Sequence, residues 1–301
     1  MDGLLVIDKP EGITSHDVVA RVRRVLKTKR VGHTGTLDPF ATGVLVLLLG
    51  KATRLAQFLD KDTKEYIATV KFGFETDTGD KTGVRSAECG LRNEELARLL
   101  KKTDWDLILS QFKGEIEQTP PMYSAKKIEG KKLYELARKG IEIERQPVRI
   151  NVYEIAILAN EIHNPQSTIR IRVACSAGTY IRTLAEDIGR RLGIGAHLTE
   201  LRRTAAGAFR IDEAVTLESL QTLDDPTVAL RPIDEATSSL RMFELSDERV
   251  EKTKSGMSTR DLSGLFADGE SVQMIDQNGE LIAIGRFNET EKAIQPKIVL
   301  V

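Results

Sequence analysis

The chain has 301 residues, of which 41% are hydrophobic and 30% are charged, and its formal net charge is −1. These proportions are typical of a soluble globular protein with room for one large and one smaller domain. No apolar run reaches the length that would cross a bilayer, and the first residues do not form a signal peptide. We therefore expect a cytoplasmic protein with no membrane partner.

The cysteines and histidines do not suggest a metal site. Cys89 and Cys175 lie far apart, and neither belongs to a C-x-x-C pair, so we expect reduced thiols. The histidines are also spread along the chain without metal-ligand spacing: His16, His33, His163 and His197. A phosphate-binding loop is excluded because Lys51 is followed by Ala52. We expect neither a metal nor a cofactor.

Charge is segregated along the chain although its total is near zero. Basic side chains gather in residues 21–30, 126–139 and 190–203, whereas residues 212–251 are rich in Asp and Glu. A single basic run is commonly an ordinary solvated helix face. Three runs around one central motif instead favour a surface that binds a polyanion through phosphate contacts.

The apolar pattern predicts an alternation of strands and helices. In chain order these are a strand at 3–7, a capped helix from about 15 to 26, a buried strand at 44–49, a short helix at 52–59, a strand at 64–73, an amphipathic helix at 93–102, and adjacent strands at 148–159 and 168–175. From about residue 245, short strand signals alternate with turns such as Asn278-Gly279. This last part predicts a small all-β module.

Residues 32–43, with the sequence GHTGTLDPFATG, stand directly before the buried strand and contain one carboxylate, Asp38. Glycines on both sides allow a ligand to approach the backbone closely. Pro39 restricts the backbone of Asp38 to extended geometry, which helps to hold the carboxylate in one direction. By themselves these residues are also compatible with an ordinary turn.

Several segments resemble the motifs of the TruB family, the tRNA pseudouridine-55 synthases. They are DKPEGITS at 8–15, GHTGTLDP and ATGVL within 32–45, TDTGD at 76–80, SAGTYIRTLA at 176–185 and GAHLTELRR at 195–203. The resemblance implies an α+β catalytic core in residues 1–240, with a mixed, mainly antiparallel sheet flanked by helices and loops. For residues 245–301 it implies a PUA-like RNA-binding domain.

The resemblance also assigns roles to particular side chains. Asp38 takes the place of the catalytic aspartate, either as the nucleophile at the ribose or as the base that removes the C2′ proton. Arg182 takes the place of its arginine partner, and Tyr66 that of the catalytic-site tyrosine that stacks on the target base. The other expected substrate contacts are Lys9, His33, Tyr180 and Leu201, among which His33 would support displaced loop bases.

Residues 118–143 are expected to form an RNA-clamping insertion. Two prolines open the segment and Gly140 ends a short basic helix, so the segment should be exposed and suited to phosphate contacts. Its expected RNA contacts are Lys126, Lys127, Lys131 and Lys132. In the TruB family this insertion is mobile and closes over the RNA stem-loop.

The implied partner is the T-arm stem-loop of tRNA, with the target uridine flipped out of the loop. The clamp, together with a chain that starts at the first strand, favours a bacterial enzyme that works without a guide RNA, and we expect a monomer. A tRNA-folding chaperone would need the basic surfaces but not Asp38. A pseudouridine synthase for another RNA is the closest enzymatic alternative.

Overall fold

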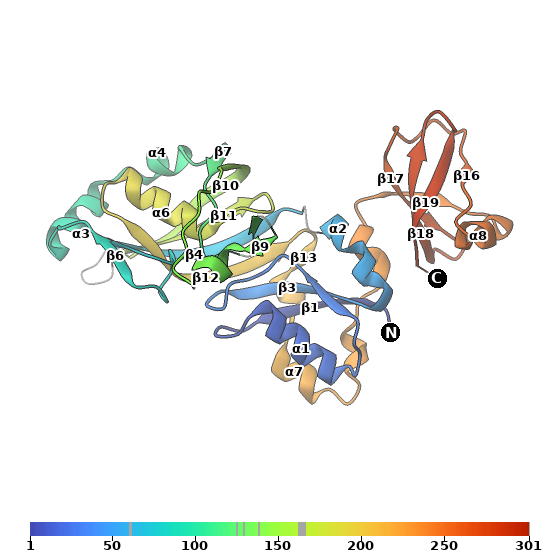
Figure 1. The fold of residues 1–301 in the computed structure, drawn as a ribbon, viewed down its shortest axis with the longest axis horizontal. Coiled ribbons are helices and arrows are strands. Elements are labelled where there is room, and N and C mark those ends of the chain that lie inside the picture. The colour runs from blue at the N-terminus through green and yellow to red at the C-terminus, as the bar shows by residue number, and fades with distance from the viewer. Residues whose placement is uncertain (60–61, 125, 129, 138, 162–166, 301) are drawn as a thin grey trace.

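The computed structural model describes residues 1–59, 62–124, 126–128, 130–137, 139–161 and 167–300. Within these residues, ten strands form one long twisted sheet (Figure 1). Its main path runs through β14 (Val215–Thr216), β1 (Gly3–Lys9), β3 (Thr42–Leu49), β12 (Ala196–Ala206), β4 (Lys64–Phe72), β11 (Thr168–Cys175), β10 (Val148–Glu161) and β7 (Gly114–Gln118). β2 (Val31–Thr34) pairs with β3, and β13 (Phe209–Arg210) pairs with β12. Only the β1–β14 and β3–β12 pairs are parallel among the described pairs of this sheet, which confirms the predicted mixed, mainly antiparallel arrangement.

The strands β1 and β3 are buried on both faces, which explains their nearly continuous apolar sequences. One face packs against α1 (Ser15–Val25) and α7 (Leu217–Thr222). The other face packs against the 3₁₀ helices η1 (Gly50–Leu55) and η4 (Ile233–Thr237) and against α2 (Ala56–Leu59), and the same apolar cluster continues into the C-terminal sheet. The short helix predicted at 52–59 is therefore a 3₁₀ turn followed by one α-helical turn.

The helix α1 begins where the sequence predicts. Thr14 is its N-cap and forms a capping box with Asp17, and Val18, Val19 and Val22 are buried on its inner face. Ser15, in the first turn, is also buried. Ser15 therefore faces the inside of the protein, next to the loop that carries Asp38.

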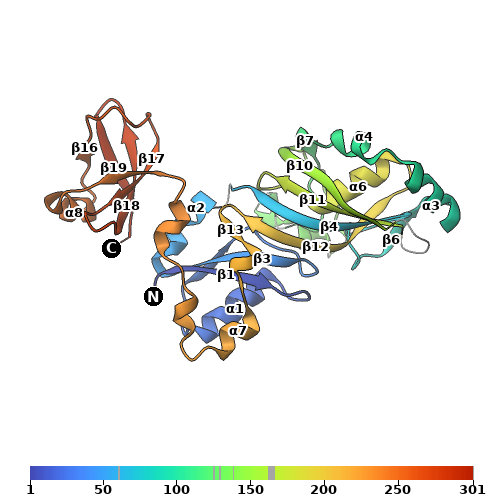
Figure 2. The ribbon, with the colours of Figure 1, turned by 180° about the vertical axis from the view of Figure 1, so that it is seen from behind.

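The other half of the sheet is covered by a second group of helices (Figures 1 and 2). These are α3 (Asn93–Lys102), α4 (Trp105–Ser110) and α6 (Ile181–Arg191). β4 alternates buried and partly exposed residues along its length, as a strand with one covered face should. Its buried residues Tyr66, Ala68, Val70 and Phe72 join the same core as Leu184 and Ile188 of α6.

The C-terminal residues form a separate five-stranded sheet, so the predicted all-β part of the fold is confirmed. In spatial order its strands are β15 (Arg241–Glu244), β17 (Ser271–Ile275), β18 (Leu281–Asn288), β19 (Ala293–Val299) and β16 (Thr259–Arg260). A helix that the pattern did not predict, α8 (Asp247–Lys254), packs beside β18 and β19. The remaining 3₁₀ helices are η2 (Ile211–Glu213) and η3 (Pro226–Ala229).

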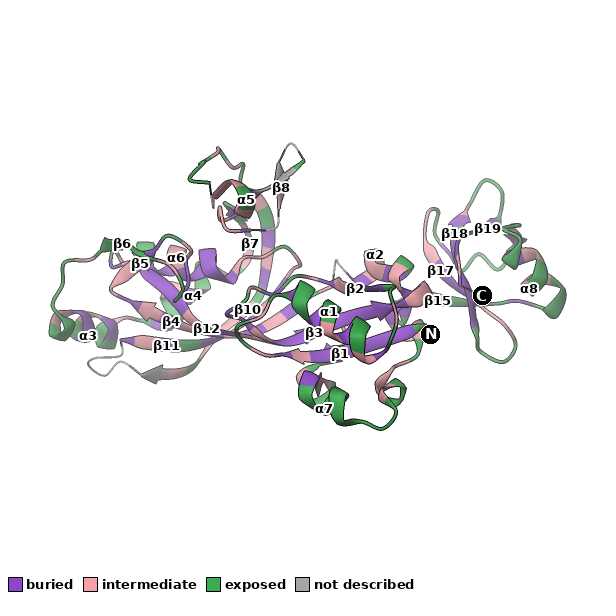
Figure 3. Ribbon diagram, turned by 60° about the horizontal axis from the view of Figure 1, so that its bottom comes forward, coloured by how far each residue is buried: buried purple, intermediate pink, exposed green. Residues whose placement is uncertain are grey.

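Two small hairpins stand outside these sheets. One pairs β5 (Phe74–Thr76) with β6 (Arg85–Glu88), and the other pairs β8 (Lys127–Ile128) with β9 (Lys131–Lys132). The second hairpin and α5 (Leu133–Ala137) project from the body of the protein beside β7 (Figure 3). Among the described helices, none is both long and apolar enough to span a membrane.

Candidate active site

The loop between β2 and β3 carries Asp38 and is held from inside the protein. The hydroxyl of Ser15 accepts a hydrogen bond from the amide of Leu37 over 2.9 Å and donates one to the carbonyl of Leu37 over 3.2 Å. The amide of Ala41 donates to the carbonyl of Asp38 over 3.1 Å. These contacts fix the backbone on both sides of the carboxylate.

Lys9 supports the same loop from behind. Its Nζ donates to the carbonyls of Pro10, Ile13 and Pro39 over 2.8, 2.7 and 3.3 Å, and the residue is fully buried. Burial lowers the pKa of Lys9 to about 8, partly offset by the nearby Asp38. Lys9, which the sequence predicts as a substrate contact, lines neither of the two cavities beside Asp38; its ammonium group instead holds the loop.

Asp38 is paired with Arg182, the residue predicted from the sequence. Arg182 Nε lies 2.9 Å from Asp38 Oδ2, and its other two nitrogens donate to the carbonyls of Thr78 and Tyr123 over 2.8 and 2.7 Å. A second carboxylate, Asp80, lies 3.8 Å from Arg182 NH1 and is itself buried. Arg182 thus joins Asp38, the loop that contains Thr78 and Asp80, and the start of the clamp segment.

The charges around Asp38 oppose each other. Burial raises its pKa above the usual value, Arg182 lowers it, and the second carboxylate of Asp80 raises it. About a third of the Asp38 side chain (34%) is exposed to the cavity, whereas only 5% of the Arg182 side chain is exposed. The net direction is upward, and Arg182 is the main group that opposes it and holds the carboxylate in one direction.

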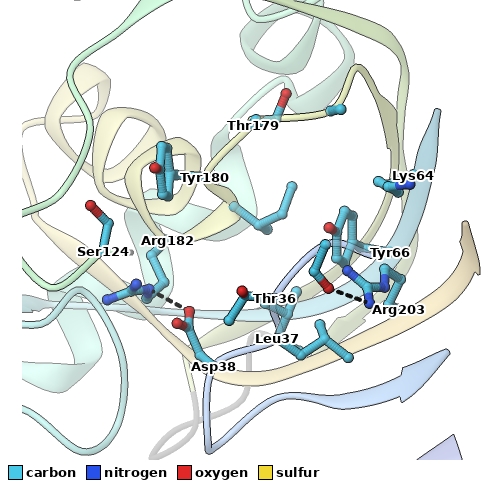
Figure 4. Close-up of a pocket in the computed structure, with 15 residues that line it drawn as sticks. Thr36, Leu37, Asp38, Lys64, Tyr66, Ser124, Thr179, Tyr180, Arg182 and Arg203 are labelled. Atoms are coloured by element: carbon cyan, nitrogen blue, oxygen red, sulfur yellow. Dashed lines mark hydrogen bonds and ion pairs between the residues drawn. The ribbon is translucent and has the colours of Figure 1, made fainter. Parts of the chain in front are cut away.

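A cavity of about 230 Å³ opens beside this ion pair (Figure 4). Five residues predicted for the site share its lining: Asp38, Tyr66, Tyr180, Arg182 and Leu201. An adjoining cavity of about 570 Å³ shares Asp38 and Arg182 with it and extends to His16 and to Tyr134 of the clamp segment. The site thus has a small pocket for one flat group and a wider entrance.

His33 lies near the site but lines neither cavity. Its ring meets the ring of His16 edge-on at a centroid distance of 5.4 Å. Burial, together with the positive charges of His16 and Arg203, lowers the pKa of His33 to about 4. A neutral imidazole agrees with a role in support of the loop and not in proton transfer.

The clamp lysines are only partly described. Lys126 is half-buried, and the side chains of Lys127, Lys131 and Lys132 lie outside the described part of the structure. Leu133, the first residue of α5, is fully buried, and its amide donates to the carbonyl of Lys126 over 2.9 Å.

Three further residues at the site were missed by the sequence interpretation: Asp80, Gln118 and Arg203. Asp80 belongs to the TDTGD loop that resembles a family motif, but nothing in the sequence places it beside Arg182. Gln118 and Arg203 are buried polar residues, which only their tertiary contacts identify. In the described part of the chain, no cluster of three His, Cys, Asp or Glu residues could hold a metal ion.

Comparisons with known proteins agree with this geometry. Residues 23–181 match the family model for the N-terminal domain of TruB family pseudouridylate synthases, and residues 182–237 match the tRNA pseudouridylate synthase B C-terminal domain. A tRNA pseudouridine synthase B of Geobacillus thermodenitrificans is 48% identical over 85% of each chain. That of Bacillus subtilis is 41% identical over 94% of this chain and 92% of its own.

Solved structures of related proteins have the same fold. A chain of a Cbf5-Nop10-Gar1 complex superposes with a TM-score of 0.72 at 28% identity, and the match covers 99% of this chain and 85% of that one. A chain of an H/ACA RNP bound to a substrate RNA superposes with a TM-score of 0.70 at 26% identity, over 99% of this chain and 85% of that one. Two family models together span most of the sequence, and relatives above 40% identity cover nearly all of it. The chain therefore belongs to the TruB family of pseudouridine synthases.

Proposed function

We propose that this enzyme converts uridine 55 in the T loop of tRNA into pseudouridine. The observation that carries the proposal is the Asp38–Arg182 ion pair at the edge of a cavity with room for a single nucleobase. Pseudouridine formation breaks the N1–C1′ bond, turns the uracil ring and rejoins it through C5. This chemistry requires a directed carboxylate beside the ribose and a pocket that retains the detached ring.

Different side chains of the site have different roles in this reaction. Asp38, whose ionised form Arg182 favours, either attacks C1′ or removes the C2′ proton. Tyr66, Tyr180 and Leu201 line the cavity and hold the ring of a nucleotide that has left the loop's stack. The wider neighbouring cavity leads toward the clamp and leaves space for the RNA backbone. The four clamp lysines would then contact phosphates.

We also propose that the enzyme acts in the cytoplasm as a monomer without a guide RNA. The curated relatives carry names of tRNA-modifying synthases. A structural relative at 26% identity is a chain of an H/ACA RNP bound to a substrate RNA. Activity of the purified protein on tRNA alone, with a molar mass of one chain by light scattering, would support the proposal. A requirement for a second RNA would contradict it.

The function is tested with an unmodified T-arm stem-loop and no cofactor. Wild type should form pseudouridine at the single target uridine, and Asp38→Asn should form none while its RNA affinity stays within several-fold. Asp106→Asn makes the same exchange at an exposed position of α4 and serves as the control. Binding without product in wild type would favour a tRNA-folding chaperone, and product only on other RNAs would favour a different target.

A further inference from the structure

A second arginine lies at the floor of the small cavity. Arg203 of β12 is paired across the sheet with Tyr66 of β4, and it is 1% exposed. Its Nε donates to the carbonyl of Val44 over 2.7 Å and one terminal nitrogen donates to the carbonyl of Gly35 over 3.0 Å. The nearby guanidinium also opposes the rise in the pKa of Tyr66 that burial causes. Arg203 and Tyr66 lie together on one side of the cavity, opposite Asp38 and Arg182 (Figure 4).

The two arginines of the cavity differ in how their charge is balanced. Arg182 faces the carboxylates of Asp38 and Asp80. Among the described residues, no carboxylate oxygen forms an ion pair within 4.0 Å of the Arg203 guanidinium, which donates to two backbone carbonyls. Withdrawing such a cation from water is costly unless an anion balances it.

Another cationic side chain lines the cavity on the same side as Arg203. Lys64, 5% exposed, lines the same cavity and donates to the carbonyl of Leu59 over 3.1 Å. The charge of Arg203 contributes to the lowered pKa of both Lys9 and His33, after the larger effect of burial. The side of the cavity away from Asp38 thus carries two cationic side chains, Arg203 and Lys64.

We propose that Arg203 stabilises the negative charge that the uracil ring carries while it is detached from the ribose. This inference rests on the proposed function. When the C1′–N1 bond breaks, its electron pair stays with N1, and the charge spreads over N1, O2 and O4 of the ring. The ring becomes neutral again when C5 bonds to C1′, C5 loses its proton and N1 gains one.

The proposal does not depend on which role Asp38 plays. If Asp38 attacks C1′, the ring leaves as an anion and C5 later displaces the carboxylate. If Asp38 removes the C2′ proton, the electrons of that C–H bond form the C1′–C2′ double bond and expel the same anion. Asp38 then returns the proton to C2′ when C5 bonds to C1′. A fixed cation in a site with little water lowers the energy of this intermediate without any reorganisation.

The first test uses wild type alone. A stem-loop with an abasic target ribose leaves the cavity empty, and the complex is titrated with uracil and with 6-azauracil, a more acidic ring of the same shape. Affinity for 6-azauracil should rise at least about tenfold as the pH is raised through its pKa, while uracil, which stays neutral, serves as the reference. An unchanged or falling affinity for the ionised ring would overturn the proposal.

The second test changes Arg203. Arg203→Gln should lower kcat about 100-fold with little change in KM, and Arg203→Lys, which keeps the charge, should recover at least about a tenth of wild-type kcat. The decrease in kcat caused by Arg203→Gln should be several-fold smaller on a stem-loop with 4-thiouridine at the target position, because sulfur itself stabilises the ring anion. A purely structural role would reduce the rates on both substrates equally and would overturn the proposal.

Controls separate the possible failures. Arg172→Gln makes the same exchange on β11 of the same sheet, outside both cavities, and should keep wild-type activity. Thermal unfolding shows whether each variant is folded, and if Arg203→Gln is not, the wild-type titration decides alone. If wild type forms no pseudouridine, the proposed function itself is contradicted. If wild type forms product but Arg203→Gln lowers kcat equally on both substrates, only the role of Arg203 is contradicted.

Discussion

Gln118 and the backbone of Tyr180 form a closed pair of hydrogen bonds. The amide of Tyr180 donates to Gln118 Oε1 over 2.8 Å, and Gln118 Nε2 donates to the carbonyl of Tyr180 over 3.0 Å. Gln118 is 1% exposed and ends β7, where the clamp segment begins. Tyr180 is the N-cap of α6, the helix that carries Arg182. The pair therefore fixes the root of the clamp against the helix that orients Asp38.

We predict that Gln118→Glu weakens both the fold and catalysis. Glutamate cannot donate to the carbonyl of Tyr180, and it places a buried charge beside that oxygen. The free energy of unfolding should fall by about 2 kcal/mol, and kcat should fall about tenfold because α6 is less well positioned. Urea unfolding and single-turnover rates measure the two effects. Gln111→Glu, at an exposed position after α4, should change neither.

The fold was largely predictable because its strands follow simple burial patterns. Alternation over residues 64–73 and the apolar run after Gly43 correspond closely to β4 and β3. The helix α8 was not predicted, since its sequence DERVEKTK is polar almost throughout and only Thr253 is buried. Local patterns could not reveal the pairings between strands far apart in the chain, such as the parallel contacts of β3 with β12 and of β1 with β14.

The site was predictable only in part, for a different reason. Residues within named motifs, such as Asp38 and Arg182, could be identified from the sequence. Lys9 belongs to such a motif too, yet its ammonium group donates its hydrogen bonds to backbone carbonyls of the protein. Gln118 and Asp80 acquire their roles from partners 62 and 102 positions away, Tyr180 and Arg182. Such contacts depend on the assembled sheet and not on local sequence.

The clamp lysines should act through phosphates and not through the chemistry. Changing Lys126, Lys127, Lys131 and Lys132 together to Gln should weaken tRNA binding at low salt. The slope of log affinity against log salt should become shallower by roughly 0.7–0.9 for each phosphate that a lysine no longer neutralises. Single-turnover rates at saturating enzyme should change much less. Lys101 and Lys102, at exposed positions at the end of α3, provide a control of the same chemistry, and an equal effect there would contradict a specific clamp.

His33 should make the stability of the protein depend on pH. Its pKa is lowered from 6.5 to about 4, and its Nδ1 has no hydrogen-bond partner among the described residues. As the pH falls below 6.5, His33 binds a proton in the unfolded chain, whereas in the folded chain it binds one only near pH 4. The free energy of unfolding therefore decreases over this range. Allowing for the partial exposure of the ring, the decrease is about 1 kcal/mol.

This contribution is measured by urea unfolding at about pH 7 and about pH 4.5. Wild type should lose about 1 kcal/mol more than His33→Gln between the two values. His16→Gln, at the exposed neighbouring ring, should keep most of the wild-type difference. Equal losses in wild type and His33→Gln would show that His33 titrates alike in both states.

Gly43 lies where the loop that carries Asp38 enters β3, directly beside the backbone of Arg203. Its φ is +101°, and an added Cβ would lie 2.2 Å from the Arg203 carbonyl oxygen. Gly12 has a similar φ of +86°, but no described atom lies within 4 Å of its added Cβ. Gly12→Ala should therefore cost only backbone strain, about 1 kcal/mol, whereas Gly43→Ala should cost more than about 3 kcal/mol. If urea unfolding shows that the two variants lose similar free energies of unfolding, β12 can move away from the loop. The close contact between β3 and β12 would then not be what holds Arg203 beside the cavity.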